Sequence, residues 1–89
     1  MPTIRFTDNI QRHVVCPPRE VQGTTLKEAL EQYFAGNARA RDYVLDDRGK
    51  LRRHMALFID GQQLEDREHL SDAVAPDAVI DVVQSLSGG

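Results

Sequence analysis

The chain has 89 residues, a length that suits one domain, and its 40% hydrophobic and 28% charged residues are ordinary for a soluble globular protein. Its net charge of −3 argues against nucleic-acid binding, because neutralising phosphates takes clustered positive charge. The apolar runs are far shorter than the roughly 20 residues that a bilayer requires, which predicts no membrane span; a single cysteine and no signal-peptide pattern predict a cytoplasmic location.

Charge is divided unevenly along the chain. Residues 1–53 hold ten Lys and Arg against seven Asp and Glu, a net +3, whereas residues 54–89 hold one Arg against seven Asp and Glu, a net −6. The acidic part is the one that leads to the carboxyl terminus. It is either a solvated surface or an acidic face that steers the end of the chain toward a basic partner.

The first predicted elements are two strands. Ile4-Arg5-Phe6 alternates apolar and polar side chains, which predicts a short strand with one buried face. Residues 7–9 have turn composition, so residues 11–16 are predicted to pair back with the first strand as a hairpin. Pro17-Pro18 would end the second strand, because proline donates no hydrogen bond to a ladder.

A helix over residues 26–34 is the clearest local pattern. Thr25 and Glu28 have the spacing of a capping box at its amino end. Gly36 is placed to end the helix in a left-handed conformation. Apolar side chains recur at helical spacing and form a single stripe: Leu26, Ala29, Leu30, Tyr33 and Phe34.

The middle of the chain is predicted as a basic loop followed by a hairpin. Residues 37–53 are polar and basic, with a hairpin tip at 47–50 between 43–45 and Leu51. Residues 55–59 form a continuous apolar run, which predicts a central strand buried on both faces. Asp60-Gly61 is a strong hairpin-turn signal, after which Leu64 is predicted to begin a short return strand.

The last strand is predicted over residues 79–83, with Asp81 facing solvent. The order strand, strand, helix, strand, short strand, strand predicts an α+β fold in which one main helix packs on one face of a mixed sheet. A small sheet with one covering helix fits a β-grasp (ubiquitin-like) architecture. We expect this domain to occupy residues 1–84 and a flexible carboxyl-terminal tail to occupy residues 85–89.

Side chains with catalytic potential form no pattern that fits a known site. The one thiol, Cys16, is three residues from His13, which on a strand puts the two side chains on opposite faces, so we interpret it as structural. The three histidines, His13, His54 and His69, lack the spacing of a metal site. The sequence has no phosphate-binding glycine loop and no nucleophile elbow. We therefore expect no bound metal and no bound cofactor.

The remaining reactive group is the α-carboxylate of Gly89. A carboxylate is a poor acyl donor until adenylation by ATP supplies a leaving group, after which a partner's sulfur anion can displace AMP. Gly88 has no Cβ and would fit a channel too narrow for any other residue. Leu86 is a candidate anchor in a partner's groove. The alternative is an exposed leucine before a diglycine that only frays.

Several segments together carry a family resemblance. They are residues 4–6, 29–34, 49–53, 55–64 and 77–83, and the most specific is the ending Leu86-Ser87-Gly88-Gly89. The whole chain resembles the MoaD/ThiS family of ubiquitin-like sulfur carriers. The resemblance implies a β-grasp fold and a protein cosubstrate rather than an enzyme.

The resemblance also implies how the carboxyl terminus is used. An adenylating enzyme of the ubiquitin-activating type would use ATP to activate Gly89. The resulting thiocarboxylate would donate sulfur to a biosynthetic enzyme for an amino acid, a cofactor or a secondary metabolite. Leu86, Ser87 and Gly88 would bind the partner.

Two features depart from the family pattern, and other functions stay open. Residues 37–54 are longer and more basic than in the compact thiamine carriers, and closer to carriers that serve amino-acid or secondary-metabolite sulfur transfer. Pro76-Asp77-Ala78 stands where members often have Gly-Asp.

The alternative functions are a protein modifier conjugated through Gly89, the small subunit of a molybdopterin-synthase-type complex, and an interaction domain with an inert tail. A metallopeptidase is a further candidate partner, for a longer precursor or for carrier adducts.

Overall fold

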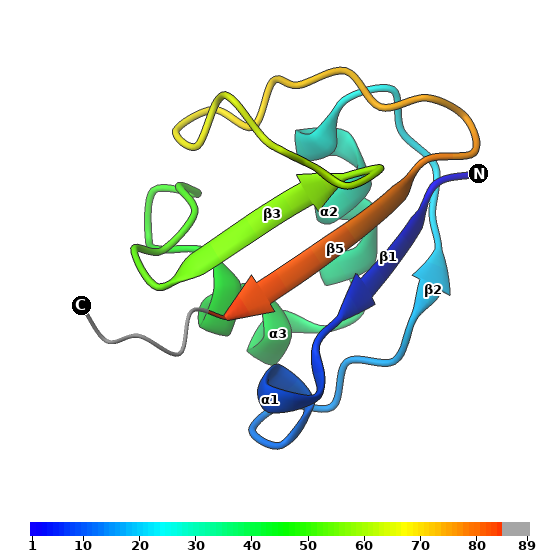
Figure 1. Cartoon of the computed structure of the whole chain (residues 1–89). Helices are drawn as coiled ribbons and strands as arrows, with labels where there is room; N and C mark the ends of the chain where they lie inside the picture. The colour runs from blue at the N-terminus through cyan, green and yellow to red at the C-terminus, as the bar shows by residue number, and fades with distance from the viewer. Residues whose placement is uncertain (85–89) are drawn as a thin grey trace.

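The computed structural model describes residues 1–84 and arranges their strands in one mixed sheet (Figure 1). Five strands lie in the order β2-β1-β5-β3-β4. β1 and β5 are parallel, and the other neighbours are antiparallel. The strands are β1 (Thr3–Phe6), β2 (Arg19–Glu20), β3 (Met55–Ile59), β4 (Gln62–Gln63) and β5 (Val79–Gln84). The predicted α+β class with a mixed sheet is confirmed.

One face of the sheet is covered by α2 (Leu26–Phe34), which has the bounds that the sequence predicts (Figure 1). The Thr25 hydroxyl accepts a hydrogen bond from the Glu28 amide at 3.2 Å, as a capping box requires. The Glu28 carboxylate accepts from the Thr24 amide at 2.8 Å, one residue before the cap. All five residues of the predicted apolar stripe are buried.

The end of α2 differs from the prediction. The residue after the helix, Ala35, is right-handed, and Gly36 is not among the glycines with positive φ. The chain instead turns with a hydrogen bond from the Asn37 amide to the Phe34 carbonyl, at 3.0 Å. The predicted left-handed glycine cap is therefore wrong, since a right-handed turn into the next helix replaces it.

The core lies between α2 and the sheet. Along β5, Ile80 and Val82 are fully buried, while the other residues of the strand are half-buried. β3 alternates in the same way: Met55 and Leu57 are buried, and Phe58 is half-buried. The prediction of a central strand buried on both faces is wrong, because the helices cover only one face and because β5, not β3, lies at the middle of the sheet.

The predicted second strand at residues 11–16 is also wrong. A short helix, α1 (Asp8–Gln11), occupies the start of this region, and the Val14 amide donates to the Ile10 carbonyl at 3.1 Å. Ile10 and Val14 are both buried while Arg12 between them is exposed, which is helical spacing, because on a strand all three side chains would share one face. The strand that pairs with β1 is β2, so Pro17-Pro18 precedes the second strand and does not end it.

A further helix, α3 (Ala38–Val44), lies where the sequence predicts a loop. Asn37 caps it, with its side-chain oxygen accepting from the Ala40 amide at 3.2 Å. Ala40 and Val44 are its buried residues. The hairpin predicted after it is reduced to a single bridge between Leu45 and Leu51.

The turn between β3 and β4 is as predicted. Asp60 and Gly61 have φ values of 52° and 84°, the two positive values of a type I′ hairpin turn. The return strand is shifted from Leu64 to Gln62–Gln63, because Leu64 is buried in the core. Within residues 1–84, no helix is long and apolar enough to cross a bilayer.

Candidate functional site at the carboxyl-terminal end of β5

The predicted site residues Leu86, Ser87, Gly88 and Gly89 lie outside the described residues. What the structure describes is the strand that leads to them. β5 is the middle strand, with Phe6 of β1 opposite Val82 and with Met55 of β3 opposite Gln84. The chain is therefore paired on one side as far as Gln84, directly before the predicted site.

The side chain of Gln84 is held by two helices that the sequence did not predict. Its Oε1 accepts a hydrogen bond from the Tyr43 hydroxyl of α3 at 2.9 Å. The same oxygen accepts from the Asn9 amide nitrogen of α1 at 3.4 Å. The His13 ring stacks on the Tyr43 ring, with centroids 5.7 Å apart. We call the set Asn9, Tyr43 and Gln84 the Gln84 clamp; it fixes the end of β5 against both helices.

A bidentate ion pair joins β5 to β1 on the open face of the sheet. Nε and Nη2 of Arg5 donate to the two carboxylate oxygens of Asp81 at 2.8 and 3.0 Å. Asp81 lies on the open face, as predicted, and is half-buried there by this pair. The pair fits the register of the two parallel strands, in which Arg5 and Asp81 are directly opposite.

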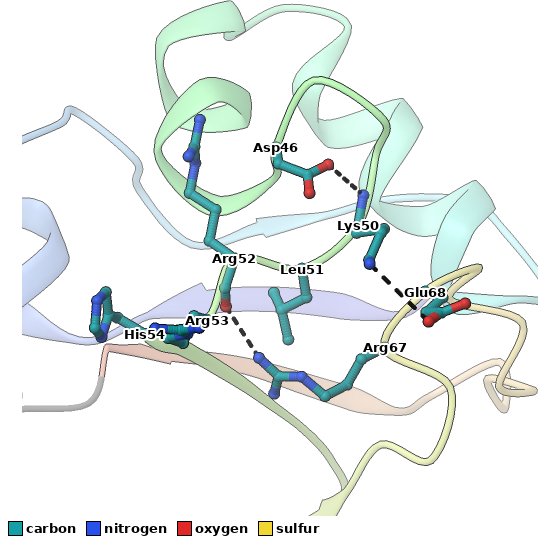
Figure 2. Close-up of a pocket in the computed structure, with 8 residues that line it drawn as sticks. All are labelled: Asp46, Lys50, Leu51, Arg52, Arg53, His54, Arg67 and Glu68. Carbon is teal, nitrogen blue, oxygen red and sulfur yellow. Dashed lines mark hydrogen bonds and ion pairs between the residues drawn. The ribbon is translucent and has the colours of Figure 1, made fainter. Parts of the chain in front are cut away.

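A basic hollow lies beside the carboxyl-terminal end of β5 (Figure 2). It is lined by Asp46, Lys50, Leu51, Arg52, Arg53, His54, Arg67 and Glu68. The segment before β3 supplies most of these residues, and the loop after β4 supplies the last two. Because Met55 begins β3 and pairs with Gln84, the residues just before Met55 lie next to the end of β5.

Several hydrogen bonds hold the walls of the basic hollow in place. The Arg67 guanidinium donates to the carbonyl of Arg52 at 2.9 Å (Figure 2). It also donates to the carbonyl of Met55 at 2.9 Å. The Nε of Arg52 donates to the Asp42 carbonyl at 2.9 Å. The acceptors in these contacts are neutral carbonyl oxygens, so the contacts do not neutralise the charge of Arg52 or Arg67.

The two carboxylates that line the hollow, those of Asp46 and Glu68, already make polar contacts within this chain. The Asp46 carboxylate accepts from the amides of Lys50 at 3.0 Å and Arg48 at 2.8 Å, and these hydrogen bonds, the Lys50 amide first, lower the pKa of Asp46. Glu68 lies 4.0 Å from the Lys50 ammonium, at the limit of an ion pair. Arg52, Arg53 and Arg67 have no carboxylate within ion-pair distance in residues 1–84.

Asp81, the acidic residue nearest in sequence to the diglycine, is paired with Arg5, and two other acidic residues lie at the opposite end of β5. Asp60 follows β3 and accepts from the Val79 amide at 2.9 Å, at the start of β5. Asp77 also precedes β5. The sequence allows two interpretations of residues 54–89, a solvated surface or an acidic face. Asp60, Asp77 and Asp81 form no acidic face at the point where the strand ends, because antiparallel pairing of β3 with β5 brings basic residues there instead.

The structure also locates the other residues with catalytic potential. Cys16 is buried, and burial raises the pKa of its thiol, which is the opposite of what a nucleophilic cysteine needs. The Cys16 Sγ lies 3.3 Å from the Val14 carbonyl. His69 Nδ1 is 3.7 Å from the Asp66 carboxylate in the loop after β4. No group of three His, Cys, Asp or Glu within the described part of the chain could hold a metal ion.

The mixed sheet with β1 and β5 parallel at its middle and α2 across one face defines the β-grasp fold of ubiquitin-like proteins. No protein-family model and no curated protein sequence matches this chain. Solved structures do match it along its whole length.

A chain of the BexX/CysO complex from Amycolatopsis orientalis is similar with a TM-score of 0.82 at 16% identity, covering 100% of both chains. SAMP1 from Haloferax volcanii has a TM-score of 0.77 at 20% identity, over 99% of this chain and 98% of that one. CysO from Mycobacterium tuberculosis, described as an antigen, has a TM-score of 0.80 at 16% identity, over 97% of this chain and 100% of that one. At these identities the likeness shows the fold, and the predicted β-grasp architecture is confirmed.

Proposed function

We propose that this protein is a sulfur carrier whose Gly89 carboxyl group is adenylated and then converted to a thiocarboxylate. The observation that carries the proposal is the ubiquitin-like fold, whose last described strand leads directly into the Leu86-Ser87-Gly88-Gly89 sequence. The likeness to CysO and SAMP1 structures supports the same general kind of protein.

The proposed chemistry takes place in partner enzymes. A carboxylate oxygen of Gly89 attacks the α-phosphorus of ATP, and pyrophosphate leaves. A sulfide-level sulfur nucleophile then attacks the acyl carbon, the C–O bond to AMP breaks, and the product is a thiocarboxylate. The thiocarboxylate is then the sulfur donor for a biosynthetic enzyme, and ATP is consumed only by the activating partner.

The role of this chain is to present the reacting group. β5 and the Gln84 clamp hold the point from which residues 85–89 start. From Val83 to Gly89 a fully extended chain reaches at most about 20 Å, which sets the depth of active site that the carboxylate can enter. Glycine at position 88 removes the steric barrier to a narrow channel. Leu86 would fill an apolar pocket of the partner.

Intact-mass analysis tests the proposal. The full chain is incubated with ATP, a sulfide source and the ubiquitin-activating-type adenylating enzyme of the same organism. We expect AMP release and the mass gain of one oxygen replaced by one sulfur, located in the carboxyl-terminal peptide. A Gly88→Val variant, which adds a branched side chain, should not be converted. AMP release without any sulfur incorporation, or no reaction of the wild-type chain, would contradict the proposal.

Protein modification is a second candidate, because two neighbours are structures of small archaeal modifier protein 1, from Methanosarcina acetivorans and Haloferax volcanii. The acyl-adenylate is common to both functions, but here a lysine amine displaces AMP and forms an isopeptide bond. Cells that express an amino-terminally tagged chain would then contain high-mass conjugates, which disappear when Gly89 is deleted. Conjugates that persist without Gly89 would rule out this route.

A further inference from the structure

Charge is segregated between the two ends of the central strands. At one end of the β3–β5 ladder Met55 pairs with Gln84, and at the other Ile59 pairs with Ile80. Four residues of strand separate these pairs, which is about 13 Å at the usual rise per residue. This exceeds the Debye length of about 8 Å at physiological ionic strength, so a partner meets the charge of each end separately.

The basic hollow is the positively charged end. Four cationic side chains line it, against two carboxylates, in a chain whose net charge is −3. The cations are Lys50, Arg52, Arg53 and Arg67. An approaching acidic surface therefore meets a net repulsive charge on the molecule as a whole and a local attraction at the hollow, which favours encounters at the end of β5.

The hollow is also preorganised. Arg67 ties its loop to the turn before β3 through two carbonyls, and Arg52 is fixed to the backbone of α3. Side chains that are already held lose less conformational freedom on binding than free surface arginines do. Arg53, in contrast, is exposed and makes no side-chain hydrogen bond or ion pair within residues 1–84, so it is available to a partner.

We infer that the basic hollow binds an acidic segment of the adenylating enzyme that receives residues 85–89. The inference rests on the proposed function, because it names the chemistry of the surface that this partner presents beside its channel. The partner charge is opposite to that of the basic partner, which is one of the two interpretations of the acidic residues before the diglycine.

Steady-state adenylation kinetics with charge-reversal variants of the full chain test the inference. The variants are Arg53→Glu alone and Arg52→Glu with Arg53→Glu. The matched control is Arg19→Glu with Lys27→Glu, which makes the same charge change on β2 and α2, away from the hollow. We expect the double reversal to raise the KM for the carrier about tenfold while kcat stays within about twofold, because rim charges govern encounter. The control should keep the wild-type KM.

Salt dependence and thermal unfolding distinguish a loss of charge attraction from a loss of folded protein. Raising the salt from about 0.05 to about 0.5 M should shrink the difference between wild type and the reversed variants, because screening removes the attraction. Arg53→Glu removes no side-chain hydrogen bond or ion pair within residues 1–84, so the variant should unfold near the wild-type temperature and still raise KM.

The outcomes distinguish the inference from the proposed function. A wild-type chain that is adenylated with the same KM as the reversed variants would overturn the inference and leave the function standing. A wild-type chain that is not adenylated would overturn both. Tighter binding of a single-stranded DNA oligonucleotide than of the enzyme, abolished by the double reversal, would show that the hollow binds nucleic acid and would overturn the protein partner.

Discussion

Gly23 is the residue whose backbone leaves no room for a side chain. Its φ is +152°, and an added Cβ would lie 2.7 Å from the backbone nitrogen of Ala29. The close approach brings the segment after β2 against the first turns of α2. The neighbouring backbone belongs to the helix and has little freedom to move away.

Gly23→Ala is therefore expected to destabilise the protein by about 1–3 kcal/mol, the usual cost of forced overpacking. Urea denaturation measures the change. Gly36→Ala is the matched control, because no atom lies within 4 Å of the added Cβ there, and its effect should stay within about 0.5 kcal/mol. Equal effects of the two substitutions would contradict the steric explanation.

The Gln84 clamp is a pairwise interaction that can be measured on its own. Tyr43→Phe, Gln84→Ala and the double variant form a cycle, and we expect a coupling free energy of about 0.5–1.5 kcal/mol, typical of one net hydrogen bond. A parallel cycle with Asn9→Ala should give a smaller coupling, because its bond to the same oxygen is longer, at 3.4 against 2.9 Å. A Tyr43–Gln84 coupling of zero would show that the clamp does not fix the end of β5.

At the scale of elements, the loop between β4 and β5 is organised by one carboxylate. Asp66 accepts hydrogen bonds from the Ser71 hydroxyl at 2.6 Å and from the amides of His69 and Glu68 at 3.0 and 3.2 Å. These bonds, with that from Ser71 the largest, lower the pKa of Asp66 from 3.8 to about 2. The loop in turn carries Arg67 into the basic hollow.

A carboxyl group whose pKa is lower in the folded state stabilises that state when it is ionised. The contribution of Asp66 is thus complete above pH 3.8 and is lost as the pH falls toward 2. Thermal unfolding across this range should show Asp66→Asn less stable than wild type at neutral pH and equal to it near pH 2. In Ser71→Ala the loss should be smaller and should be complete at a higher pH, because without its largest hydrogen bond the pKa of Asp66 in the folded state is lowered less. A wild-type advantage that persists unchanged at the lowest pH would contradict this role.

At the scale of the whole molecule, β5 joins the two ends of the described chain. It pairs with β1 from the amino-terminal residues and with β3 from the middle, and the buried residues form one hydrophobic cluster. The parallel pairing of β1 with β5 joins the two halves of the chain in one sheet. Folding and loss of the sheet should consequently be a single cooperative event.

Unfolding followed by far-ultraviolet circular dichroism and by tyrosine fluorescence is expected to give coincident transitions. The two tyrosines report different places, since Tyr33 is buried in the core and Tyr43 belongs to the Gln84 clamp. A tyrosine transition that precedes the loss of circular dichroism would show that the end of β5 opens separately from the core.

The elements that the sequence predicts correctly are those defined by neighbouring residues. The cap at Thr25 with the apolar stripe of α2, and the Asp60-Gly61 turn, depend on spacings of a few residues. The two helices that it missed are short and have few buried side chains: Ile10 in α1, and Ala40 and Val44 in α3. For α3 a local signal was present in the Asn37 cap and the four-residue spacing of its buried pair.

By itself, then, the sequence determined the α+β class, the main helix, the hairpin turn and the apolar strands, because propensity, capping and periodicity act over a few residues. The Gln84 clamp joins residues 41 and 75 positions apart. The basic hollow likewise lies beside the end of β5 only because Met55 pairs with Gln84. Strand register sets which distant side chains meet, and register is decided by burial of the whole sheet against the helices. The tertiary structure alone therefore decided what surrounds the end of β5.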